Sequence, residues 1–244
     1  MIRALVLSGD GINCETETAF ACKQAGFDVD VVSVARLIDN KFSQTQLEFS
    51  YRLLVLPGGF SFGDDLGSGR ILALKIRKGL GWNLKAFSEQ GGMVLGICNG
   101  FQALIRLGVF GKEVSITKNS SNQFIDRWVN LKVNMANRSP WLSAYSEFEL
   151  PIRHGEGRLL FSTQAKENFD TAIQYACDIN GSQENIAGIT TKDGRILGLM
   201  PHPEAFVKRT QHPTWTKYPE KCADVGDGLQ LFKNAYEELR NNVT

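Results

Sequence analysis

The first half of the chain alternates short apolar runs with segments of helical character. The apolar runs read as strands, and they lie at residues 2–7, 29–34, 53–56 and 93–97. Helical segments are expected at residues 15–25, 70–88 and 99–107, with weak points in the second at Gly79 and Gly81. Apolar strands separated by helices are typical of a parallel sheet covered on both faces. This half therefore predicts an α/β layered fold.

The pattern changes in the second half. Apolar and polar residues alternate over 129–135, as in a strand with one solvent-facing side. Residues 186–200 form two apolar runs around Asp193-Gly194, which is a strong signal for a hairpin. We therefore expect antiparallel additions to the sheet in the C-terminal half.

The end of the chain is expected to be helical from about Gly228, with Asp227 as a candidate cap. One face of this helix would carry Leu229, Phe232, Tyr236 and Leu239. Residues 206–226 read as a long irregular excursion. Since neither an internal repeat nor a low-complexity linker interrupts the pattern, we expect residues 1–244 to form one domain.

Composition narrows the class of protein. The chain has 244 residues, 43% of them hydrophobic, and a formal net charge of +1. The sequence has no basic stripe of the kind that would indicate a nucleic-acid partner. The apolar run near the N-terminus is too short for a signal peptide, and no run approaches the length of a membrane span. We therefore expect a cytoplasmic protein without a nucleic-acid or membrane partner.

The number and spacing of the cysteines also suit a cytoplasmic protein. Their number is odd and their spacing contains no C-x-x-C pair, so neither a disulfide framework nor a metal site is expected. They are Cys14, Cys22, Cys98, Cys177 and Cys222.

One cysteine has a distinctive setting. Cys98 lies in "GICNG", between the strand predicted at 93–97 and the helix predicted at 99–107. Strand, G-x-C-x-G and helix together are the cysteine version of a nucleophile elbow, in which Gly96 and Gly100 avoid collisions across a tight turn. The helix N-terminus would favour a thiolate there. Cys98 is thus a candidate nucleophile, although a buried core cysteine remains an alternative reading.

A cysteine nucleophile needs a base and usually a third group that orients the base. The chain has only three histidines, and His212 lies in the irregular excursion. His154 in "RHGEG" and His202 in "MPHPE" each precede a glutamate by two positions. Residues i and i+2 of extended backbone face the same side, so either glutamate could orient its histidine. The local sequence favours His202 as the base, because His202 follows a predicted strand. His154 remains the alternative.

A further strand end carries glycines. "LPGGF" follows the strand at 53–56, and Gly58-Gly59 allows the backbone to approach a ligand closely. The backbone amides of Gly59 and Phe60 are candidate donors to an oxyanion. A plain turn after a strand is the alternative reading.

Together these motifs resemble the class I glutamine amidotransferases. The family's G-x-C-x-G-x-Q elbow matches residues 96–102, and its H-P-E triad segment matches residues 202–204. "LPGGFSFGD", "RHGEGR" and "GLMPHPE" are similar to the glutaminase subunits of phosphoribosylformylglycinamidine synthases, as are "GDGINCETETAFA" and "DGLQLF". This resemblance spans about residues 1–235 and implies a flavodoxin-like layered fold with a mostly parallel central sheet.

The resemblance also implies roles for individual residues. Cys98 would be the nucleophile, His202 the general base and acid, and Glu204 the orienting carboxylate. The amides of Gly59 and Asn99 look like the oxyanion donors. Gln102 would contact the bound glutamine. His154 and Glu156 would lie at the edge of the site or face the synthetase.

The implied reaction is hydrolysis of glutamine to glutamate and ammonia through a cysteine thioester. The ammonia would serve ATP-dependent conversion of formylglycinamide ribonucleotide to formylglycinamidine ribonucleotide in de novo purine biosynthesis. The chain contains no phosphate-binding motif, so no cofactor is expected in it, and ATP and Mg are expected on a partner. The implied partners are a large synthetase subunit and a small third subunit.

Two stretches depart from the family pattern. Residues 122–124 follow Asn119-Ser120-Ser121 where a glycine is expected, and the excursion at 206–226 is longer than in compact stand-alone subunits. The competing interpretations are another cysteine hydrolase, such as a γ-glutamyl hydrolase or a stress-type elbow-cysteine protein, and a regulatory subunit with an inactive glutaminase fold. "PHPE" speaks against the stress-type protein, and the intact candidate triad speaks against the regulatory subunit.

Overall fold

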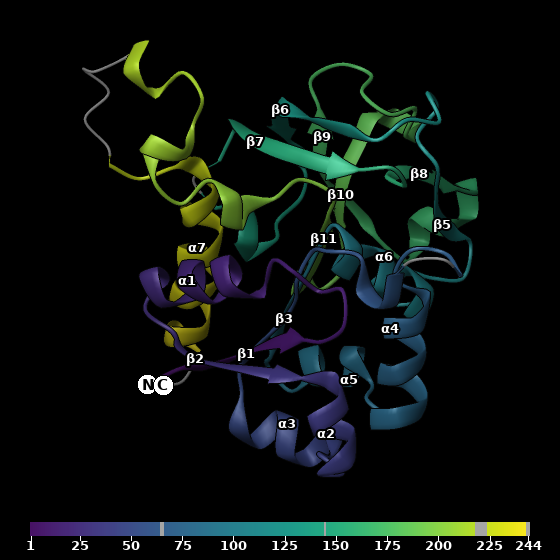
Figure 1. Cartoon of the computed structure of the whole chain (residues 1–244), viewed down its shortest axis with the longest axis vertical. Helices are drawn as coiled ribbons and strands as arrows, with labels where there is room; N and C mark the ends of the chain where they lie inside the picture. Colours follow the sequence, from purple (N-terminus) through teal and green to yellow (C-terminus); the bar gives the residue numbers. More distant parts are fainter. Residues whose placement is uncertain (64–65, 144, 218–223, 243–244) are drawn as a thin grey trace.

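The computed structural model describes residues 1–63, 66–143, 145–217 and 224–242 (Figure 1). Its strands are β1 (Arg3–Ser8), β2 (Asp28–Ser33), β3 (Leu53–Leu56), β4 (Met93–Ile97), β5 (Val114–Thr117), β6 (Ile125–Val133), β7 (Glu147–His154), β8 (Arg158–Phe161), β9 (Asp170–Tyr175), β10 (Ile186–Thr190) and β11 (Ile196–Leu199). Its α-helices are α1 (Glu15–Ala25), α2 (Val34–Asp39), α3 (Gln44–Ser50), α4 (Arg70–Leu74), α5 (Leu84–Glu89), α6 (Asn99–Leu107) and α7 (Asp227–Asn241).

A single large sheet joins both halves of the chain. Among the described residues its strand order is β2-β1-β3-β4-β11-β10-β9-β6-β7, and β5 pairs with β8 in a separate small sheet. Neighbours from β2 to β11 are parallel, and neighbours from β11 to β7 are antiparallel. The order of the parallel half is that of flavodoxin-like folds. The expected α/β fold with antiparallel additions is confirmed.

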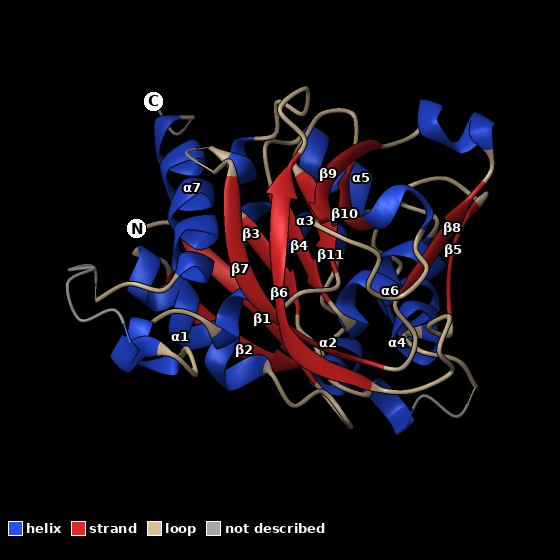
Figure 2. Ribbon diagram, turned by 90° about the horizontal axis from the view of Figure 1, so that it is seen from above, coloured by secondary structure: helices blue, strands red, loops and turns tan. Residues whose placement is uncertain are grey.

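Helices cover both faces of the parallel half. α1 lies beside α7 on one side of the sheet, and α4 and α6 pack together on the other (Figure 2). The predicted apolar face of α7 is confirmed, since Leu229, Phe232 and Leu239 are buried and the ring of Tyr236 packs edge-on against Phe27. None of the described helices combines the length and the apolar character needed to cross a membrane.

Two helix predictions need correction. The single helix expected at 70–88 is interrupted: α4 continues as a π-helical turn over Lys75–Leu80, and the chain then reverses at Gly81, whose φ is 66°. Asn83 restarts the helix, because its side chain accepts hydrogen bonds from the amides of Lys85 and Ala86. Gly81 therefore ends the helix, whereas Gly79 lies within the π-helical turn.

The expected cap of the last helix is also wrong. Gly226 occupies the cap position, and Asp227 lies in the first helical turn. The Asp227 carboxylate accepts a hydrogen bond from the Glu149 amide at 3.1 Å, so it ties α7 to β7. The described part of the excursion, residues 206–217 and 224–226, is irregular as predicted, with short 3-10 turns at Arg209–Gln211 and Trp215–Lys217 and a bridge between Lys208 and Val225. Residues 218–223, including Cys222, lie outside the described residues.

The register of two central strands decides where the candidate catalytic residues meet. β4 and β11 are parallel neighbours, with Ile97 opposite Leu199. The Cys98 amide donates to the Leu199 carbonyl at 2.8 Å, so both strands end at one level. Parallel strands present their carboxyl ends at the same edge of a sheet. Cys98 and His202, which follow these two ends, are therefore brought to the same edge.

We predict that this arrangement depends on Gly198 in β11. A Cβ at this position would lie 2.0 Å from the ring of Phe101, the buried aromatic residue of α6. Gly198→Ala should therefore lower the free energy of unfolding by about 1–3 kcal/mol through overpacking, measured by urea denaturation. Combining it with Phe101→Leu should cost less than the sum of the two single changes.

Gly9→Ala is the matched control, because a Cβ there would meet only side-chain atoms at ordinary contact distance. It should change the free energy of unfolding by less than about 0.5 kcal/mol. If the effects of Gly198→Ala and Phe101→Leu were strictly additive, the proposed contact between the two positions would be excluded.

Candidate active site

Cys98 lies on a strained turn between β4 and α6. Its φ of 50° and ψ of −104° are unusual for a residue with a side chain. A Cβ at Gly96 would lie 3.0 Å from the backbone of Gly100, and a Cβ at Gly100 would lie 1.9 Å from the carbonyl oxygen of Leu56. Only glycine fits at both positions. The geometry of a nucleophile elbow, which the sequence predicts, is confirmed.

The Cys98 side chain faces a small cavity at the carboxyl edge of the sheet. The thiol donates to the Arg153 carbonyl oxygen at 3.6 Å and is only 5% exposed. The cavity has a volume of about 90 Å³ and is lined by Asn13, Cys14, Gly59, Phe60, Cys98, Phe124, Arg153 and His202. At its rim the rings of Phe60 and Phe124 lie 6.2 Å apart and are about half exposed. Residues distant in sequence thus surround one thiol.

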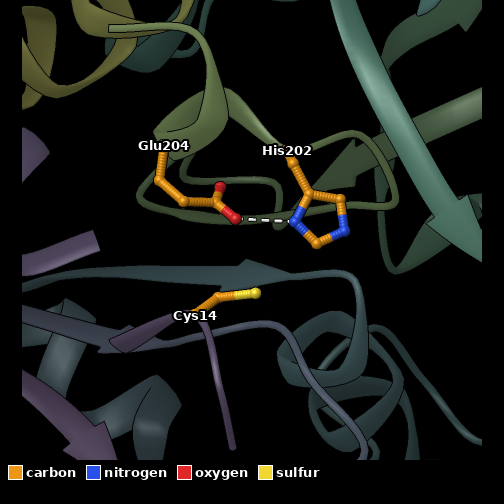
Figure 3. A group of neighbouring side chains, drawn as sticks. All are labelled: Cys14, His202 and Glu204. Carbon is orange, nitrogen blue, oxygen red and sulfur yellow. Dashed lines mark hydrogen bonds and ion pairs between the residues drawn. The ribbon is translucent and has the colours of Figure 1, made fainter. Parts of the chain in front are cut away.

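His202 and Glu204 form a buried pair beside this cavity. His202 follows β11, and a 3-10 turn at Pro203–Ala205 brings Glu204 alongside it. The His202 Nδ1 and Glu204 Oε1 atoms lie 2.6 Å apart (Figure 3). The two residues are 2% and 1% exposed, respectively. Glu204 therefore lies where it could orient His202.

The electrostatics of the pair follow from its burial. Burial by itself would lower the pKa of His202, because it disfavours the charged ring. The Glu204 carboxylate, helped by the nearby Cys98 and Cys14 thiols, outweighs burial and raises the pKa of His202 well above its usual range. A proton is therefore held on the Nδ1 side of the ring, between histidine and carboxylate.

The second H-x-E segment has a different geometry. The His154 Nδ1 atom lies 3.0 Å from the Asn119 side-chain oxygen, and not beside a carboxylate. The Glu156 carboxylate instead accepts a hydrogen bond from the Ser68 amide at 3.4 Å. Burial, with a smaller contribution from the charge of His202, lowers the pKa of His154 to about 4. His154 is therefore a neutral ring close to the site. Of the two histidines considered as the base, His202 is the one that lies beside a carboxylate.

The two candidate oxyanion donors of the "LPGGF" segment are not equivalent. The Phe60 amide donates to the Gly11 carbonyl at 2.7 Å, so it is already engaged, contrary to its expected role. Gly59 lines the cavity with a φ of 138°, and a Cβ there would lie 2.6 Å from the Gly11 oxygen. Asn99 begins α6 directly after Cys98. Gly59 and Asn99 thus remain the two candidates.

Gln102 has a different place from the one expected. Its side-chain NH₂ donates to the Glu156 carbonyl at 2.5 Å, and its oxygen accepts from the Asn99 side chain at 3.0 Å. The Asn99 oxygen in turn accepts from the Ser61 amide at 3.1 Å. Gln102 is buried and does not line the cavity. It joins α6 to the "HGEG" loop, residues 154–157. Its position therefore does not favour a direct contact with bound glutamine.

Several residues near the site were not singled out by sequence reasoning. Cys14, which precedes α1, points toward the His202–Glu204 pair (Figure 3). Tyr175 ends β9 with a buried hydroxyl that has no hydrogen-bond partner among the described residues, and Arg153 lines the cavity. Asn119 holds the "HGEG" loop, because its side chain contacts His154 and the Gly157 amide. Cys14 falls within the "GDGINCETETAFA" segment. The resemblance of this segment to the family was the one feature of the sequence that could have indicated a place for Cys14 near the site.

Comparison with known proteins agrees with this geometry. Residues 1–237 match the family model of the CobB/CobQ-like glutamine amidotransferase domain. The phosphoribosylformylglycinamidine synthase subunit PurQ of Dehalococcoides mccartyi is 36% identical, over 98% of this chain and 98% of the relative. The PurQ subunit of Methanococcus maripaludis strain S2 is 37% identical over 96% of each chain.

A solved structure has the same fold over the full length. In the structure of PurLQS from Thermotoga maritima, one chain superposes with a TM-score of 0.77 and 30% identity, covering 100% of this chain and 99% of that one. The chain therefore belongs to the CobB/CobQ-like glutamine amidotransferase family and, within it, to the PurQ subunits of phosphoribosylformylglycinamidine synthase.

Proposed function

We propose that Cys98, His202 and Glu204 form the catalytic triad with which this glutaminase subunit releases ammonia from glutamine for purine biosynthesis. The observation that carries the proposal is the buried His202–Glu204 pair, 2.6 Å apart, at the same sheet edge as a cysteine on a strained elbow. A nucleophile, a base and a group that orients the base are the parts that acyl transfer requires.

The reaction begins when the Cys98 thiol gives its proton to the His202 ring and its sulfur attacks the side-chain amide carbon of glutamine. The amide oxygen becomes an oxyanion, and the backbone N–H groups of Gly59 and Asn99 stabilise it. His202 gives a proton to the departing nitrogen, so the C–N bond breaks and ammonia leaves. The γ-glutamyl group remains on Cys98 as a thioester.

A water molecule completes the cycle. His202 takes a proton from this water as the oxygen attacks the thioester carbon, and it returns that proton to the Cys98 sulfur as the C–S bond breaks, which gives glutamate and the free thiol. Glu204 keeps its hydrogen bond to His202 Nδ1 throughout, which stabilises the charged ring. The small cavity suits the end of a glutamine side chain, with the aromatic pair Phe60 and Phe124 at its rim.

The ammonia requires an acceptor that this chain does not supply. The Thermotoga maritima relative was solved as PurLQS, so we propose that this chain assembles with a large PurL-type synthetase and a small PurS-type subunit. In this proposal, ATP and Mg bind the synthetase, which converts formylglycinamide ribonucleotide to formylglycinamidine ribonucleotide. We also propose a cytoplasmic location and a single domain over residues 1–244, supported by the sheet that joins both halves.

The "HGEG" loop is proposed to shape the site without taking part in the chemistry. His154 is buried and neutral, and Gln102 holds the loop backbone at Glu156. Because Gln102 belongs to α6, a movement of this loop would be felt at the elbow. This link supports a position for His154 and Glu156 at the site edge, where a synthetase could influence the glutaminase.

Cys98→Ala should reduce glutamine-dependent product formation by at least about 10³-fold, because the thioester cannot form. The measurement is synthesis of formylglycinamidine ribonucleotide by the assembled complex with glutamine, compared with free ammonium salts as the nitrogen source. Activity with ammonium should be retained, because the amidation takes place on the synthetase, and co-purification with the synthetase should show that the variant still assembles.

The control is Cys177→Ser, which removes an exposed thiol outside the site and should leave both activities unchanged. If Cys98→Ala kept more than a tenth of the glutamine-dependent rate, Cys98 would not be the nucleophile.

Glu204→Gln should lower kcat by about 10²–10⁴-fold, because an amide does not stabilise the charged His202 ring. It should also move the titration of the His202 ring, followed by NMR, to lower pH, since the carboxylate raises that pKa. The matched control is Glu156→Gln in the other H-x-E segment. A larger shift in the control than in Glu204→Gln would contradict the pairing.

His154 should make stability depend on pH. Folded His154 binds a proton only near pH 4, whereas the unfolded side chain does so near its ordinary pKa of 6.5. Its contribution to stability is therefore complete above pH 6.5 and is lost as the pH falls toward 4, by up to about 3 kcal/mol. His154→Gln should flatten the curve of unfolding free energy against pH in this window, measured by urea denaturation.

His212→Gln is the control for this effect, because His212 lies in the excursion and pairs with Glu149. Equal slopes in the wild type and His154→Gln between pH 6.5 and 4 would show that His154 is not held neutral by the fold.

A further inference from the structure

A second thiol lies against the proposed catalytic pair. The Cys14 sulfur, a His202 ring nitrogen and a Glu204 carboxylate oxygen all lie within 4.8 Å of one another, and all three residues are buried (Figure 3). A Cβ at Gly58 would lie 2.8 Å from the His202 Cε1 atom and 3.3 Å from the Cys14 sulfur. The thiol and the Cε1 edge of the ring therefore border the same point, on the side of His202 that faces Glu204.

The glutaminase mechanism leaves parts of this cluster unused. It needs one thiol, Cys98, and it uses one oxygen of Glu204. The other oxygen, Glu204 Oε2, is buried and has no hydrogen-bond partner among the described residues. Burial raises the pKa of the Cys14 thiol, whereas its hydrogen bond with His202 acts in the opposite direction. A buried carboxylate oxygen without a partner is uncompensated unless another group binds it.

We propose that Cys14, His202 and Glu204 form a binding site for a soft divalent cation of the zinc class, and that the bound cation inhibits the glutaminase. Zn²⁺ prefers thiolate, imidazole and carboxylate ligands, and each is present once. Sequence spacing could not predict the site, because Cys14 belongs to the start of the chain and the other two follow β11. Binding itself does not depend on the proposed function, whereas the inhibition rests on it.

Protons must leave when the cation binds. The Cys14 thiol becomes a thiolate and releases its proton to solvent, and the proton between His202 Nδ1 and Glu204 is also displaced. No electron transfer or bond to substrate is involved. Because protons are released when the cation binds, the affinity for the cation should increase with pH.

The proposed site should bind Zn²⁺ in preference to Mg²⁺. Mg²⁺ prefers oxygen ligands in octahedral geometry and gains little from a thiolate or an imidazole. The Mg²⁺ that accompanies ATP should therefore leave the glutaminase active, whereas Zn²⁺ should occupy the base that the reaction needs.

The binding test uses Co²⁺ as a spectroscopic substitute for Zn²⁺ on the full chain. Co²⁺ should produce a thiolate-to-metal charge-transfer absorption in the wild type, in Cys98→Ser and in Cys177→Ser, and Zn²⁺ should abolish it. Cys14→Ser should lose the absorption. Absorption that is lost in Cys98→Ser but kept in Cys14→Ser would overturn the proposal, as would no absorption in the wild type.

The inhibition test uses the assembled complex with Mg·ATP present. Zn²⁺ should reduce glutamine-dependent activity but not ammonium-dependent activity, and a chelator should restore it. The Zn²⁺ concentration for half-inhibition should rise at least tenfold in Cys14→Ser and stay unchanged in Cys177→Ser. Equal sensitivity of the wild type and Cys14→Ser would contradict the proposal. Cobalt absorption in a chain without glutaminase activity would instead refute only the proposed function.

Discussion

The hydrogen bond between His202 and Glu204 is the interaction on which the site depends. At 2.6 Å and with both residues buried, it holds a proton that an isolated buried histidine would lose. The comparison within the chain is direct, because His154 is also buried but has an amide oxygen in place of a carboxylate, and its pKa is lowered to about 4. The carboxylate beside one of two neighbouring buried histidines therefore makes the difference between a raised and a lowered pKa.

The sheet brings this pair to the nucleophile. β4 and β11 are adjacent and parallel, so Cys98 and His202 follow strands that end at one level. The glycines at 96 and 100 allow the elbow, and Gly198 allows α6 to pack closely on β11. The antiparallel half supplies the other wall of the cavity, since Arg153 lies in β7 and Phe124 just before β6. The antiparallel half of the sheet is thus what encloses the thiol.

Much of this could be predicted from the sequence, because the signals were local. The elbow at Cys98, the hairpin around Asp193-Gly194 and the helix ending at Gly26 each depend on a few adjacent residues. The expected roles of the Phe60 amide and the Gln102 side chain did not agree with the structure, since their hydrogen-bond partners, Gly11 and Glu156, are distant in sequence. Cys14 was missed for the same reason. Sequence patterns identify groups that can react, and the fold decides which of them have partners.

In the proposed mechanism, Cys98 carries the γ-glutamyl group as a thioester. The most direct measurement is mass spectrometry of the assembled complex after acid quenching during turnover of glutamine. We expect a γ-glutamyl adduct on the peptide that contains Cys98, formed and lost at rates compatible with turnover, and more abundant in Glu204→Gln if deacylation is slowed more than acylation. An adduct on Cys14, or turnover without any adduct on Cys98 when the quench is fast enough to trap a thioester, would contradict it.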